Sequence, residues 1–336
     1  MRVAVLMGGS SSEREISLRT GRGIAAALRQ LGHEALSIDA ANGRLLPPGE
    51  EERAPATEAL APAAGGGLLQ ADAIREADVV LIALHGGAGE NGTLQALLEL
   101  TGKPYTGSGV MASAVAMNKA MSKRLFEHAG IPTPAWTLVQ AGAPPREIDA
   151  RALGGYPLVV KPNEEGSTVG LSIVGDPAGL PDALRRAGEY GPDVLIERYI
   201  EGRELTVALL GEEPLPIVEI RPKSGFYDYE SKYTAGRSEY FCPADLPEPV
   251  TQQVMELAVR VARVTEVRGV SRVDFRLGED RVPYCLEINT IPGMTPTSLV
   301  PMAAKARGLS YDQVVQRMLD LALAEARRRA RAAAEA

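Results

Sequence analysis

Near the C-terminal end of the chain, two short segments with strand periodicity carry polar side chains that could bind a metal ion. In residues 270–276, a period of two places Arg272 and Asp274 on the same face of the expected strand. In the strand expected next, the same period places Glu287 and Asn289 on one face. If the two strands pair as a hairpin, the oxygen atoms of Asp274, Glu287 and Asn289 converge. Such a group suits a hard cation such as Mg²⁺, which completes its shell with water and phosphate oxygens.

The same hairpin allows a second interpretation, in which its polar side chains form the exposed face of an edge hairpin. Period two also places Leu286 and Ile288 on the face opposite Glu287. Cys285 then shares the face of Glu287, so its side chain either lies near a bound nucleotide or serves as a small packing residue. Residue types alone leave both alternatives open.

A lysine at the end of an apolar run precedes a flexible loop in residues 156–170. The run Leu-Val-Val leads to Lys161, and the loop that follows is rich in Gly, Ser and Thr. Backbone N–H groups of such a loop can surround phosphate oxygens while the lysine supplies a point charge. The pattern is not the P-loop, which needs Gly-Lys-Ser/Thr at the start of a helix. Taken alone, the segment also fits a surface hairpin.

Two further features could belong to a binding site. Residues 226–233 form a polar and aromatic segment without strand or helix period, which is typical of a lid and equally of a surface turn that packs its tyrosines. His85 directly follows a buried strand and so lies at the carboxyl edge of a sheet, where α/β folds bind ligands. A single histidine is also often structural, so this position needs support from other residues.

The N-terminal region has the alternation of strands and helices that places side chains at a sheet edge. Nearly continuous apolar runs predict buried strands at residues 2–7, 35–38 and 78–84. One helical pattern, with apolar residues from Ile16 to Leu28, ends near Gly32, and a second covers residues 93–100. This order predicts an open, largely parallel sheet.

Two more regions follow, the first of which opens with a helix expected over residues 112–128. Its strands are expected at residues 136–139, 157–161, 171–174 and 194–198. Because glycine and proline space these strands closely, they favour a smaller α+β unit. The third region begins near Glu204 and alternates strands with helices over residues 250–264 and 311–328.

Composition limits the classes of partner. The chain has 336 residues and a formal net charge of −7, which argues against a protein that binds duplex nucleic acid. Its two cysteines, Cys242 and Cys285, lack metal-ligand spacing and indicate a reducing compartment. No apolar run approaches the roughly 20 residues of a membrane helix. We therefore expect a cytoplasmic protein without membrane insertion, in which residues 41–68 form an irregular connection.

Lysines are scarce among the basic residues, since only seven of the 36 are lysines and the others are arginines. Where a lysine persists in such a chain, the position can need a compact cation in place of a planar guanidinium. Chance survival of a few lysines is the simpler interpretation of the count alone.

In their order and spacing, these stretches resemble the D-alanine–D-alanine ligases, a family of ATP-grasp enzymes. The resemblance covers nearly the whole chain, from Val3 to about Leu319, apart from residues 41–68. The stretches that carry it are residues 8–18 (GGSSSEREISL), 85–95, 104–109, 117–119, 161–170, 226–233, 272–274, 287–295 and 298–301.

The resemblance implies a three-domain α/β ATP-grasp architecture. It divides the chain into an N-terminal open parallel-sheet domain (1–106), a central ATP-grasp subdomain (107–201) and a C-terminal ATP-grasp subdomain with lid and metal site (202–336). ATP would bind between the central and C-terminal domains. The implied reaction joins two D-alanines through a D-alanyl phosphate and releases ADP and phosphate, for peptidoglycan synthesis.

The resemblance also assigns residues to the nucleotide and the metals. Three lysines would contact the ATP phosphates, and the metal ligands would hold two Mg²⁺ or Mn²⁺ ions. The implied nucleotide residues are Lys119, Lys161, Glu197, Arg198, Tyr199, Ile200, Glu204, Phe226 and Lys232, and the implied metal ligands are Asp274, Glu287 and Asn289. Within this set, Glu197 and Glu204 would serve the ribose or the adenine N–H donors. Whether a monovalent cation also binds is left open.

On the amino-acid side, the resemblance implies that Glu13 binds the ammonium of the first D-alanine, with His85 nearby. The residues implied in closing the lid over the site are Glu13, Ser167 and Tyr233. Those implied for the oxyanion and the second carboxylate are Arg272, the backbone of Gly293, Ser298 and Leu299.

Several alternatives remain beside this interpretation. A related ligase could form D-Ala-D-Ser or D-Ala-D-lactate, although Tyr233 argues against the depsipeptide. An NAD-dependent oxidoreductase lacks support because the third glycine of the dinucleotide fingerprint is missing after Gly8 and Gly9. A non-catalytic binding protein would not need the metal ligands and Arg272. The resemblance further implies a homodimer.

Overall fold

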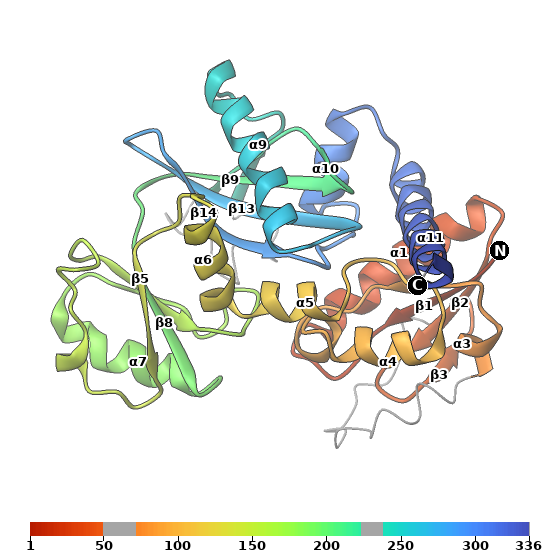
Figure 1. Cartoon of the computed structure of the whole chain (residues 1–336), viewed down its shortest axis with the longest axis horizontal. Helices are drawn as coiled ribbons and strands as arrows, with labels where there is room; N and C mark the ends of the chain where they lie inside the picture. The colour runs from red at the N-terminus through yellow and green to blue at the C-terminus, as the bar shows by residue number, and fades with distance from the viewer. Residues whose placement is uncertain (50–71, 223–237, 336) are drawn as a thin grey trace.

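The computed structural model describes residues 1–49, 72–222 and 238–335, which form three β-sheets with helices packed around them (Figure 1). The strands are β1 (Arg2–Met7), β2 (Glu34–Asp39), β3 (Arg44–Leu46), β4 (Val79–Ile82), β5 (Trp136–Gln140), β6 (Leu158–Pro162), β7 (Ser172–Val174), β8 (Asp193–Arg198), β9 (Gly202–Leu210), β10 (Glu213–Pro214), β11 (Val218–Pro222), β12 (Ser238–Phe241), β13 (Val270–Gly278) and β14 (Pro283–Asn289). The α-helices are α1 (Arg14–Gln30), α3 (Asp72–Glu76), α4 (Thr93–Thr101), α5 (Val110–Met117), α6 (Lys119–His128), α7 (Leu180–Gly188), α9 (Glu248–Val264), α10 (Leu299–Ala306) and α11 (Tyr311–Glu335). Among the described residues, none of these helices is long and apolar enough to cross a membrane.

The N-terminal sheet has the strand order β3-β2-β1-β4 and occupies the right-hand part of Figure 1. Strand β1 pairs in parallel with β2 and β4, as the buried apolar runs predict, while the short edge strand β3 is antiparallel to β2. The described part of residues 41–68 therefore contains an ordered strand, and its remainder lies outside the described residues. This sheet brings the loops after β1 and β4 to one edge.

The last helix of the chain returns to the N-terminal sheet. Side chains of β1 and α1 share one apolar cluster with α11, in which Met7, Ile24, Val315 and Leu319 are fully or almost fully buried. Figure 1 shows α11 beside α1, with both chain termini on that side of the molecule. The N-terminal lobe is thus completed by the C-terminal helix.

A smaller sheet lies apart from this lobe, on the left of Figure 1 and below the third sheet. Its strand order is β5-β8-β6-β7, all pairs are antiparallel, and α7 packs on it. This is the smaller α+β unit expected from the spacing of the strands. Lys161 of β6 and Glu197 of β8 share one face of this sheet, and both line a cavity between it and the third sheet.

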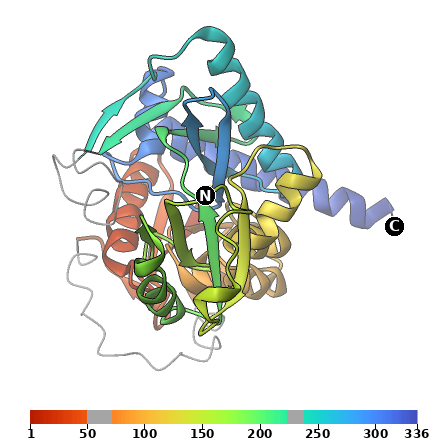
Figure 2. The ribbon, with the colours of Figure 1, turned by 90° about the vertical axis from the view of Figure 1, so that its left-hand side faces the viewer.

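The third sheet is antiparallel, with the order β12-β11-β9-β13-β14 and β10 paired to β9. The hairpin expected from period two is present as β13 and β14, and Asp274 lies directly opposite Glu287. Helix α9 packs on the face of this sheet that carries Val273 and Phe275, and Figure 2 shows it along the upper right of the sheet. The polar face of the hairpin is consequently free to line a site on the side away from α9.

The register of the hairpin differs from the expectation in one respect. A bulge separates the pair Asp274–Glu287 from the pair Phe275–Cys285, so Leu286 is the extra residue in β14. Cys285 is therefore fully buried in the apolar cluster under α9, and not on the face of Glu287. Leu286 instead lines a cavity together with Glu287, contrary to the expectation from strict alternation.

The helix expected over residues 112–128 is in fact two helices, α5 and α6. The chain leaves helical geometry at Asn118, whose side-chain oxygen accepts a hydrogen bond from the N–H of Met121 at 2.9 Å. Asn118 is thus the N-cap of α6, and the new helix begins at Lys119. Both helices pack their apolar side chains on the third sheet.

A group of charged side chains around Glu325 fastens α11 to its neighbours. Glu325 forms ion pairs with Arg268 and Arg329, and Arg329 also binds Glu99 of α4 at 2.9 Å. Hydrogen bonds from Arg328 and Arg329 lower the pKa of Glu325 to about 2, although partial burial acts in the opposite direction. The carboxylate therefore favours the folded state in its ionised form.

We expect Glu325→Gln to lower the melting temperature by a few degrees at neutral pH. Because the pKa of Glu325 is depressed in the folded protein, its stabilisation is present above about pH 4.5, the ordinary pKa, and is lost as the pH falls toward about 2. Thermal unfolding of both proteins should therefore show a difference that shrinks below about pH 4. Glu335→Gln, at the exposed end of the same helix, is the control, and an undiminished difference at low pH would contradict the prediction.

Candidate active site

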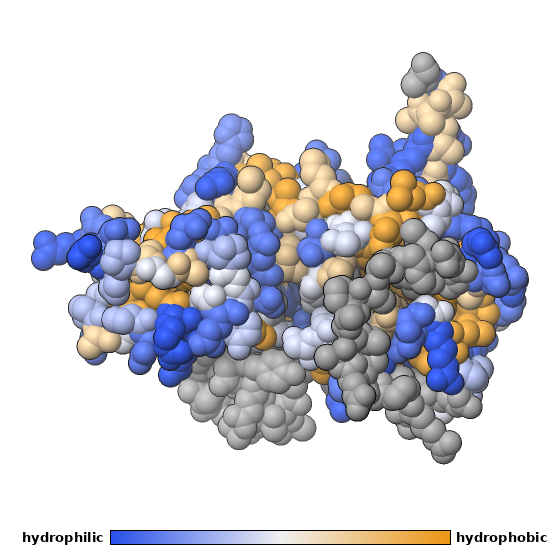
Figure 3. Space-filling view, turned by 90° about the horizontal axis from the view of Figure 1, so that it is seen from below, coloured by the Kyte–Doolittle hydropathy of each residue, from blue (hydrophilic) through white to orange (hydrophobic). Residues whose placement is uncertain are grey.

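Two adjoining cavities lie where the three sheets meet. One has a volume of about 110 Å³ and the other of about 220 Å³. Both are lined by Lys119, Glu165, Gly166, Ser167 and Glu287, so these residues form the boundary between them. Seen from below, the surface is hollowed between the lobe that carries α7 and the N-terminal lobe (Figure 3). A molecule in one cavity can therefore react with a molecule in the other across this boundary.

The smaller cavity lies between the central and third sheets. It collects every described residue that the sequence assigned to the nucleotide, together with two of the expected metal ligands. These residues are Lys119, Lys161, Glu197, Arg198, Tyr199, Ile200, Glu204, Asp274 and Glu287. Phe226 and Lys232 lie outside the described residues.

Glu197 is a buried carboxylate of the smaller cavity with two cationic neighbours. It is only 2% exposed, and its two oxygens lie 2.6 Å from the Nζ of Lys161 and 2.9 Å from the Nζ of Lys123. Burial alone would raise the pKa of Glu197, but the charges of Lys123 and Lys161 outweigh it and lower the pKa to about 2. Glu197 is thus an anion that can accept hydrogen bonds from a ligand.

The opposite wall of the smaller cavity is organised by Arg276, which sequence reasoning missed. Its guanidinium donates to the backbone oxygen of Ile200 at 3.0 Å and to the hydroxyl of Tyr199 at 3.2 Å. The same group lies 3.4 Å from Glu204 and stands 5.5 Å from the centre of the Tyr199 ring. Arg276 therefore holds three of the residues assigned to the adenosine in place. Its position two residues after Asp274, on the same strand face, was the available signal.

Lys119 lies at the boundary between the two cavities. Its ammonium donates to the backbone oxygen of Glu165 at 2.5 Å and lies 3.6 Å from Glu287. Burial lowers the pKa of Lys119, while the charge of Glu287 opposes this effect. The lysine is placed at the boundary because Asn118 caps α6 and so turns its first residue toward the cavity.

The expected metal ligands lie together on β13 and β14. Arg272 donates to both oxygens of Asp274, at 2.9 and 2.7 Å, and the Thr206 hydroxyl donates to Oδ1 at 2.6 Å. The Oδ1 of Asn289 accepts from the N–H of Ile291 at 2.8 Å. A carboxylate or amide oxygen has two lone pairs. Oδ1 of Asp274 already accepts two hydrogen bonds, whereas Oδ2 of Asp274 and Oδ1 of Asn289 each accept one of these bonds and keep a lone pair that could face a cation.

The chemistry of this donor set suits a divalent cation. Among the described residues, no group of three or more His, Cys, Asp or Glu side chains gathers as a metal site. The set consists of two carboxylates and one amide: Asp274 lines the smaller cavity, Asn289 the larger one, and Glu287 both. Mg²⁺ is commonly bound by one or two carboxylates together with substrate phosphates, and not by a cage made of protein ligands alone. This donor set fits that kind of magnesium site.

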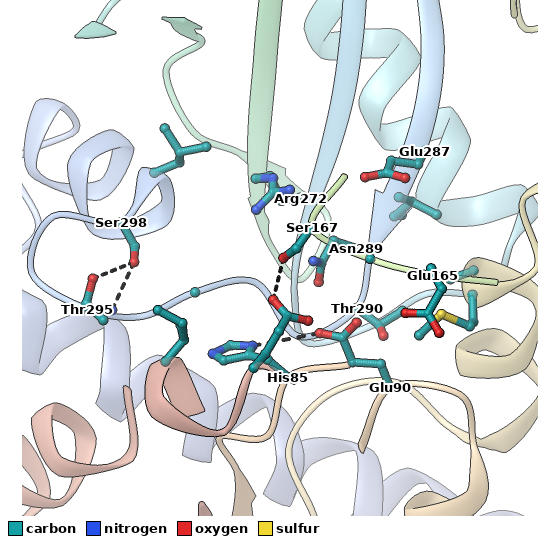
Figure 4. A pocket seen from close by; sticks show the side chains of 18 of the residues that line it. His85, Glu90, Glu165, Ser167, Arg272, Glu287, Asn289, Thr290, Thr295 and Ser298 are labelled. Atoms are coloured by element: carbon teal, nitrogen blue, oxygen red, sulfur yellow. Dashed lines mark hydrogen bonds and ion pairs between the residues drawn. The ribbon is translucent and has the colours of Figure 1, made fainter. Parts of the chain in front are cut away.

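The larger cavity lies beside the N-terminal lobe and is shown in Figure 4. Ser167 points from the loop after β6 toward this cavity, and its hydroxyl donates to the carboxylate of Glu13. Glu13 lies at the start of α1 and is 8% exposed. Ser167 and Thr168 both have positive φ angles, of 50° and 60°, which non-glycine residues rarely adopt. Such local strain is typical of functional loops.

His85 is held rigidly in the wall of the larger cavity. Its Nδ1 lies 3.0 Å from the backbone oxygen of Ile291, and its Nε2 lies 3.1 Å from the Thr20 hydroxyl. Glu90, which sequence reasoning did not single out, lies 3.7 Å from Nδ1 (Figure 4). Burial raises the pKa of Glu90, and His85 only partly opposes this effect. The available signal was an acidic residue five positions after His85, at the end of the glycine-rich loop.

At the far end of the larger cavity, Gly293 lies close to the side chain of Ser298. A Cβ added to Gly293 would lie 3.0 Å from the Oγ of Ser298, so a larger residue would require the Ser298 side chain to shift. Ser298 precedes α10, and its hydroxyl accepts from the N–H of Thr295 at 3.0 Å. Leu299 is the first residue of α10 and also lines the cavity. The N-terminus of this helix can therefore receive an anionic group.

The described residues expected on the amino-acid side are thus brought together around one cavity. They are Glu13, His85, Ser167, Arg272, Gly293, Ser298 and Leu299. Tyr233 lies outside the described residues, as does the rest of segment 226–233.

Comparison with known proteins gives the family of the chain. Residues 2–108 match a family model described as "D-ala D-ala ligase N-terminus", and residues 125–320 match one described as "D-ala D-ala ligase C-terminus". The chain is 46% identical over 318 residues to a D-alanine–D-alanine ligase of Syntrophotalea carbinolica, covering 95% of each chain. It is 45% identical over 325 residues to a D-alanine–D-alanine ligase of Gloeobacter violaceus, covering 96% of this chain and 100% of that protein.

The fold agrees with a solved structure of the same kind. The crystal structure of the D-alanine–D-alanine ligase from Bacillus anthracis complexed with ATP superposes with a TM-score of 0.79 at 31% identity. The match covers 98% of this chain and 99% of that one. The expected ATP-grasp architecture is therefore confirmed, and the chain belongs to the D-alanine–D-alanine ligase family.

Proposed function

We propose that this protein uses ATP to join two D-alanines into D-alanyl-D-alanine, with release of ADP and phosphate, for peptidoglycan synthesis. The observation that carries the proposal is the meeting of two cavities at Lys119, Ser167 and Glu287. The γ-phosphoryl group of ATP must reach a substrate carboxylate, and these residues line both sides of that meeting point. Family membership and the names of the relatives agree with this assignment.

In this proposal the smaller cavity binds ATP. Glu197 accepts hydrogen bonds from N–H donors of the base, and Glu204 accepts from the ribose hydroxyls. Lys119 and Lys161 bind phosphate oxygens as point charges, and Lys232 reaches the γ-phosphoryl group. These roles are supported by the burial of Glu197 and the position of both described lysines on the cavity wall.

Asp274, Glu287 and Asn289 would hold Mg²⁺ or Mn²⁺, and the bound metal would neutralise phosphate charge during transfer. The support is the cross-strand pairing of Asp274 with Glu287 at the cavity that receives the phosphates. Lys119 lies beside Glu287 and adds a fixed positive charge at the same place.

The larger cavity binds the two amino acids. Glu13 receives the ammonium of the first D-alanine, whose carboxylate oxygen attacks the γ-phosphorus while ADP leaves. The amine of the second D-alanine then attacks the carbonyl carbon of the acyl phosphate. Arg272 and the N–H of Gly293 stabilise the oxyanion of the tetrahedral intermediate, and phosphate departs. Ser298 and the first N–H groups of α10 bind the second carboxylate.

We expect Glu13→Gln to raise the KM for the first D-alanine by about tenfold or more, because a neutral amide replaces the charge that pairs with the ammonium. Initial rates over a range of D-alanine concentrations, fitted for two substrate sites, provide the measurement. Glu15→Gln is a matched control, since Glu15 lies on the same helix but is exposed. Equal KM values for Glu13→Gln and the unmodified enzyme would remove Glu13 from the substrate site.

The test of the function is phosphate release from Mg-ATP with D-alanine, L-alanine, D-serine and D-lactate, with each product identified by mass. Release with D-alanine alone, giving the dipeptide, is the expected result. A preference for D-alanine with D-lactate or D-serine would replace the second substrate but keep the nucleotide site. If none of the four compounds caused release while ATP bound, the amino-acid assignment would be wrong.

Three further parts of the proposal rest on family resemblance. We place domain boundaries after residues 106 and 201, and we expect the protein to form a homodimer. We also expect it to lie in the cytoplasm, which the requirement for ATP supports. Analytical ultracentrifugation measures the oligomeric state, and activity with and without K⁺ measures any dependence on a monovalent cation.

A further inference from the structure

Lys123 is a buried cation for which the proposed reaction has no use. Lys123 lies on α6, and its side chain is completely buried. Its ammonium lies 2.9 Å from the carboxylate of Glu197 and donates to the Thr133 hydroxyl at 2.7 Å. The backbone oxygen of Pro134 lies 3.4 Å away. Burying an ammonium is costly unless it is paired, and Glu197 supplies the opposite charge.

The contacts of Lys123 extend to the metal-binding hairpin. The Thr133 hydroxyl, which accepts from Lys123, donates to the backbone oxygen of Cys285 at 2.8 Å. The N–H of Cys285 donates to Pro132 at 2.8 Å, so the bulged part of β14 is bonded on both sides to the segment after α6. A continuous polar chain therefore runs from β14 through Thr133 and Lys123 to Glu197 on β8. It joins the two sheets that enclose the smaller cavity.

The two lysines that contact Glu197 differ in their access to a ligand. Lys161 lines the smaller cavity, where the proposed function gives its ammonium to the phosphates of ATP. Lys123 is fully buried and is not among the described residues that line this cavity. When Lys161 turns toward phosphate oxygens, its pairing with Glu197 weakens, while that of Lys123 is unaffected. One positive charge then remains to balance Glu197.

We propose that Lys123 is a positioning residue for the nucleotide base, which keeps Glu197 charged and oriented while Lys161 serves the phosphates. The inference rests on the proposed function of Glu197 as acceptor of N–H groups of the base. An ionised carboxylate accepts hydrogen bonds only, so it favours the 6-amino group of adenine. It disfavours the 6-carbonyl group that inosine triphosphate carries at the same position. Lys123 therefore contributes to the choice of base without touching it.

The experiment compares the unmodified enzyme with Lys123→Met, which retains an unbranched apolar stem but has no charge. Dissociation constants for ATP and inosine triphosphate are measured by calorimetry. We expect the constant for ATP to rise by about tenfold or more, because one charge of a buried pair is lost. The preference for ATP over inosine triphosphate should fall by at least about threefold. At saturating ATP, kcat should change much less, giving a split between KM and kcat.

A role in packing alone predicts a different pattern. Both nucleotides would then weaken equally, or not at all, and an unchanged preference for ATP in Lys123→Met overturns the proposal. Lys305→Met, at an exposed lysine of α10, is the control for the loss of a lysine. If Lys123→Met does not fold, Thr133→Val decides the question, since it removes only the hydroxyl that accepts from Lys123. A smaller shift of the preference in the same direction supports the proposal, and no shift overturns it.

The unmodified enzyme separates this inference from the function beneath it. If it fails to form D-alanyl-D-alanine, the proposed function is wrong. If it forms the dipeptide but binds ATP and inosine triphosphate equally, Glu197 does not read the base, and the role of Lys123 is overturned with it. If it prefers ATP and Lys123→Met retains that preference, only the role of Lys123 is wrong.

Discussion

Glu287→Gln should lower kcat for D-alanine-dependent phosphate release by about a thousandfold or more, while the fold remains intact. Glu287 lies opposite Asp274 in the hairpin and borders both cavities, so it is the ligand closest to the path of the phosphoryl group. Glutamine preserves the shape but removes the negative charge that a divalent cation needs, and metal-assisted transfer depends on that charge. Initial rates at saturating ATP and D-alanine, with Mg²⁺ varied, provide the measurement.

Glu219→Gln is a suitable control for this variant. Glu219 is a buried carboxylate on β11 of the same sheet, where it pairs with Arg203 and Arg221 away from both cavities. This control should lose stability but keep kcat per folded molecule. Activity of Glu287→Gln within about tenfold of the unmodified enzyme would show that the hairpin is not the metal site.

The second large effect is expected at Arg272. Replacing Arg272→Met should lower kcat by about 100- to 1000-fold, the usual cost of losing a donor to an oxyanion. Arg272 lines the larger cavity while its guanidinium binds Asp274 through two hydrogen bonds. Since the arginine also reduces the negative charge around Asp274, its removal should leave the affinity for Mg²⁺ unchanged or stronger.

That last point distinguishes two roles of Arg272. If the arginine serves only to orient Asp274 for metal binding, excess Mg²⁺ will restore the activity of Arg272→Met, which would contradict a role at the oxyanion. Arg221→Met is a closely matched control. On β11, Arg221 donates to Glu219 at 2.9 and 2.8 Å in the same two-residue relation that joins Arg272 to Asp274. It should retain normal kcat.

The hairpin was predictable because its information is local. Period two within each strand, together with a short turn, is enough to place Asp274 opposite Glu287 and to put Arg272 and Asn289 beside them. The parallel N-terminal sheet follows from equally local apolar runs. Its carboxyl edge then places His85 at a site without further knowledge of the fold.

Other features depend on contacts between distant segments. Beside the bulge at Leu286, the backbone of Cys285 bonds with Pro132 and with the Thr133 hydroxyl, contacts that strict alternation within β14 does not reveal. The break at Asn118 also involves a distant segment, since the N–H groups of Lys119 and Ala120 at the start of α6 donate to Asn163.

Lys123 illustrates the same limit for the site. The sequence shows that lysines are scarce in this chain. It also shows that Lys123 follows Lys119 by four residues, which places both on one face of a helix. What the sequence lacked was the approach of β8, which brings Glu197 to its ammonium. Burial and pairing of charges are properties of the assembled sheets.

The packing of α11 against the first strand also sets a condition on how the protein is made. Met7 and Val315 share one apolar cluster although about 300 residues separate them in the chain. At translation rates of roughly 5–20 residues per second, the interval between their synthesis is roughly 15–60 s. During that time the newly made N-terminal lobe lacks part of its cover and presents apolar side chains on the ribosome. The nascent chain thus has a defined period in which chaperones can bind it, and the period ends with the arrival of the last helix.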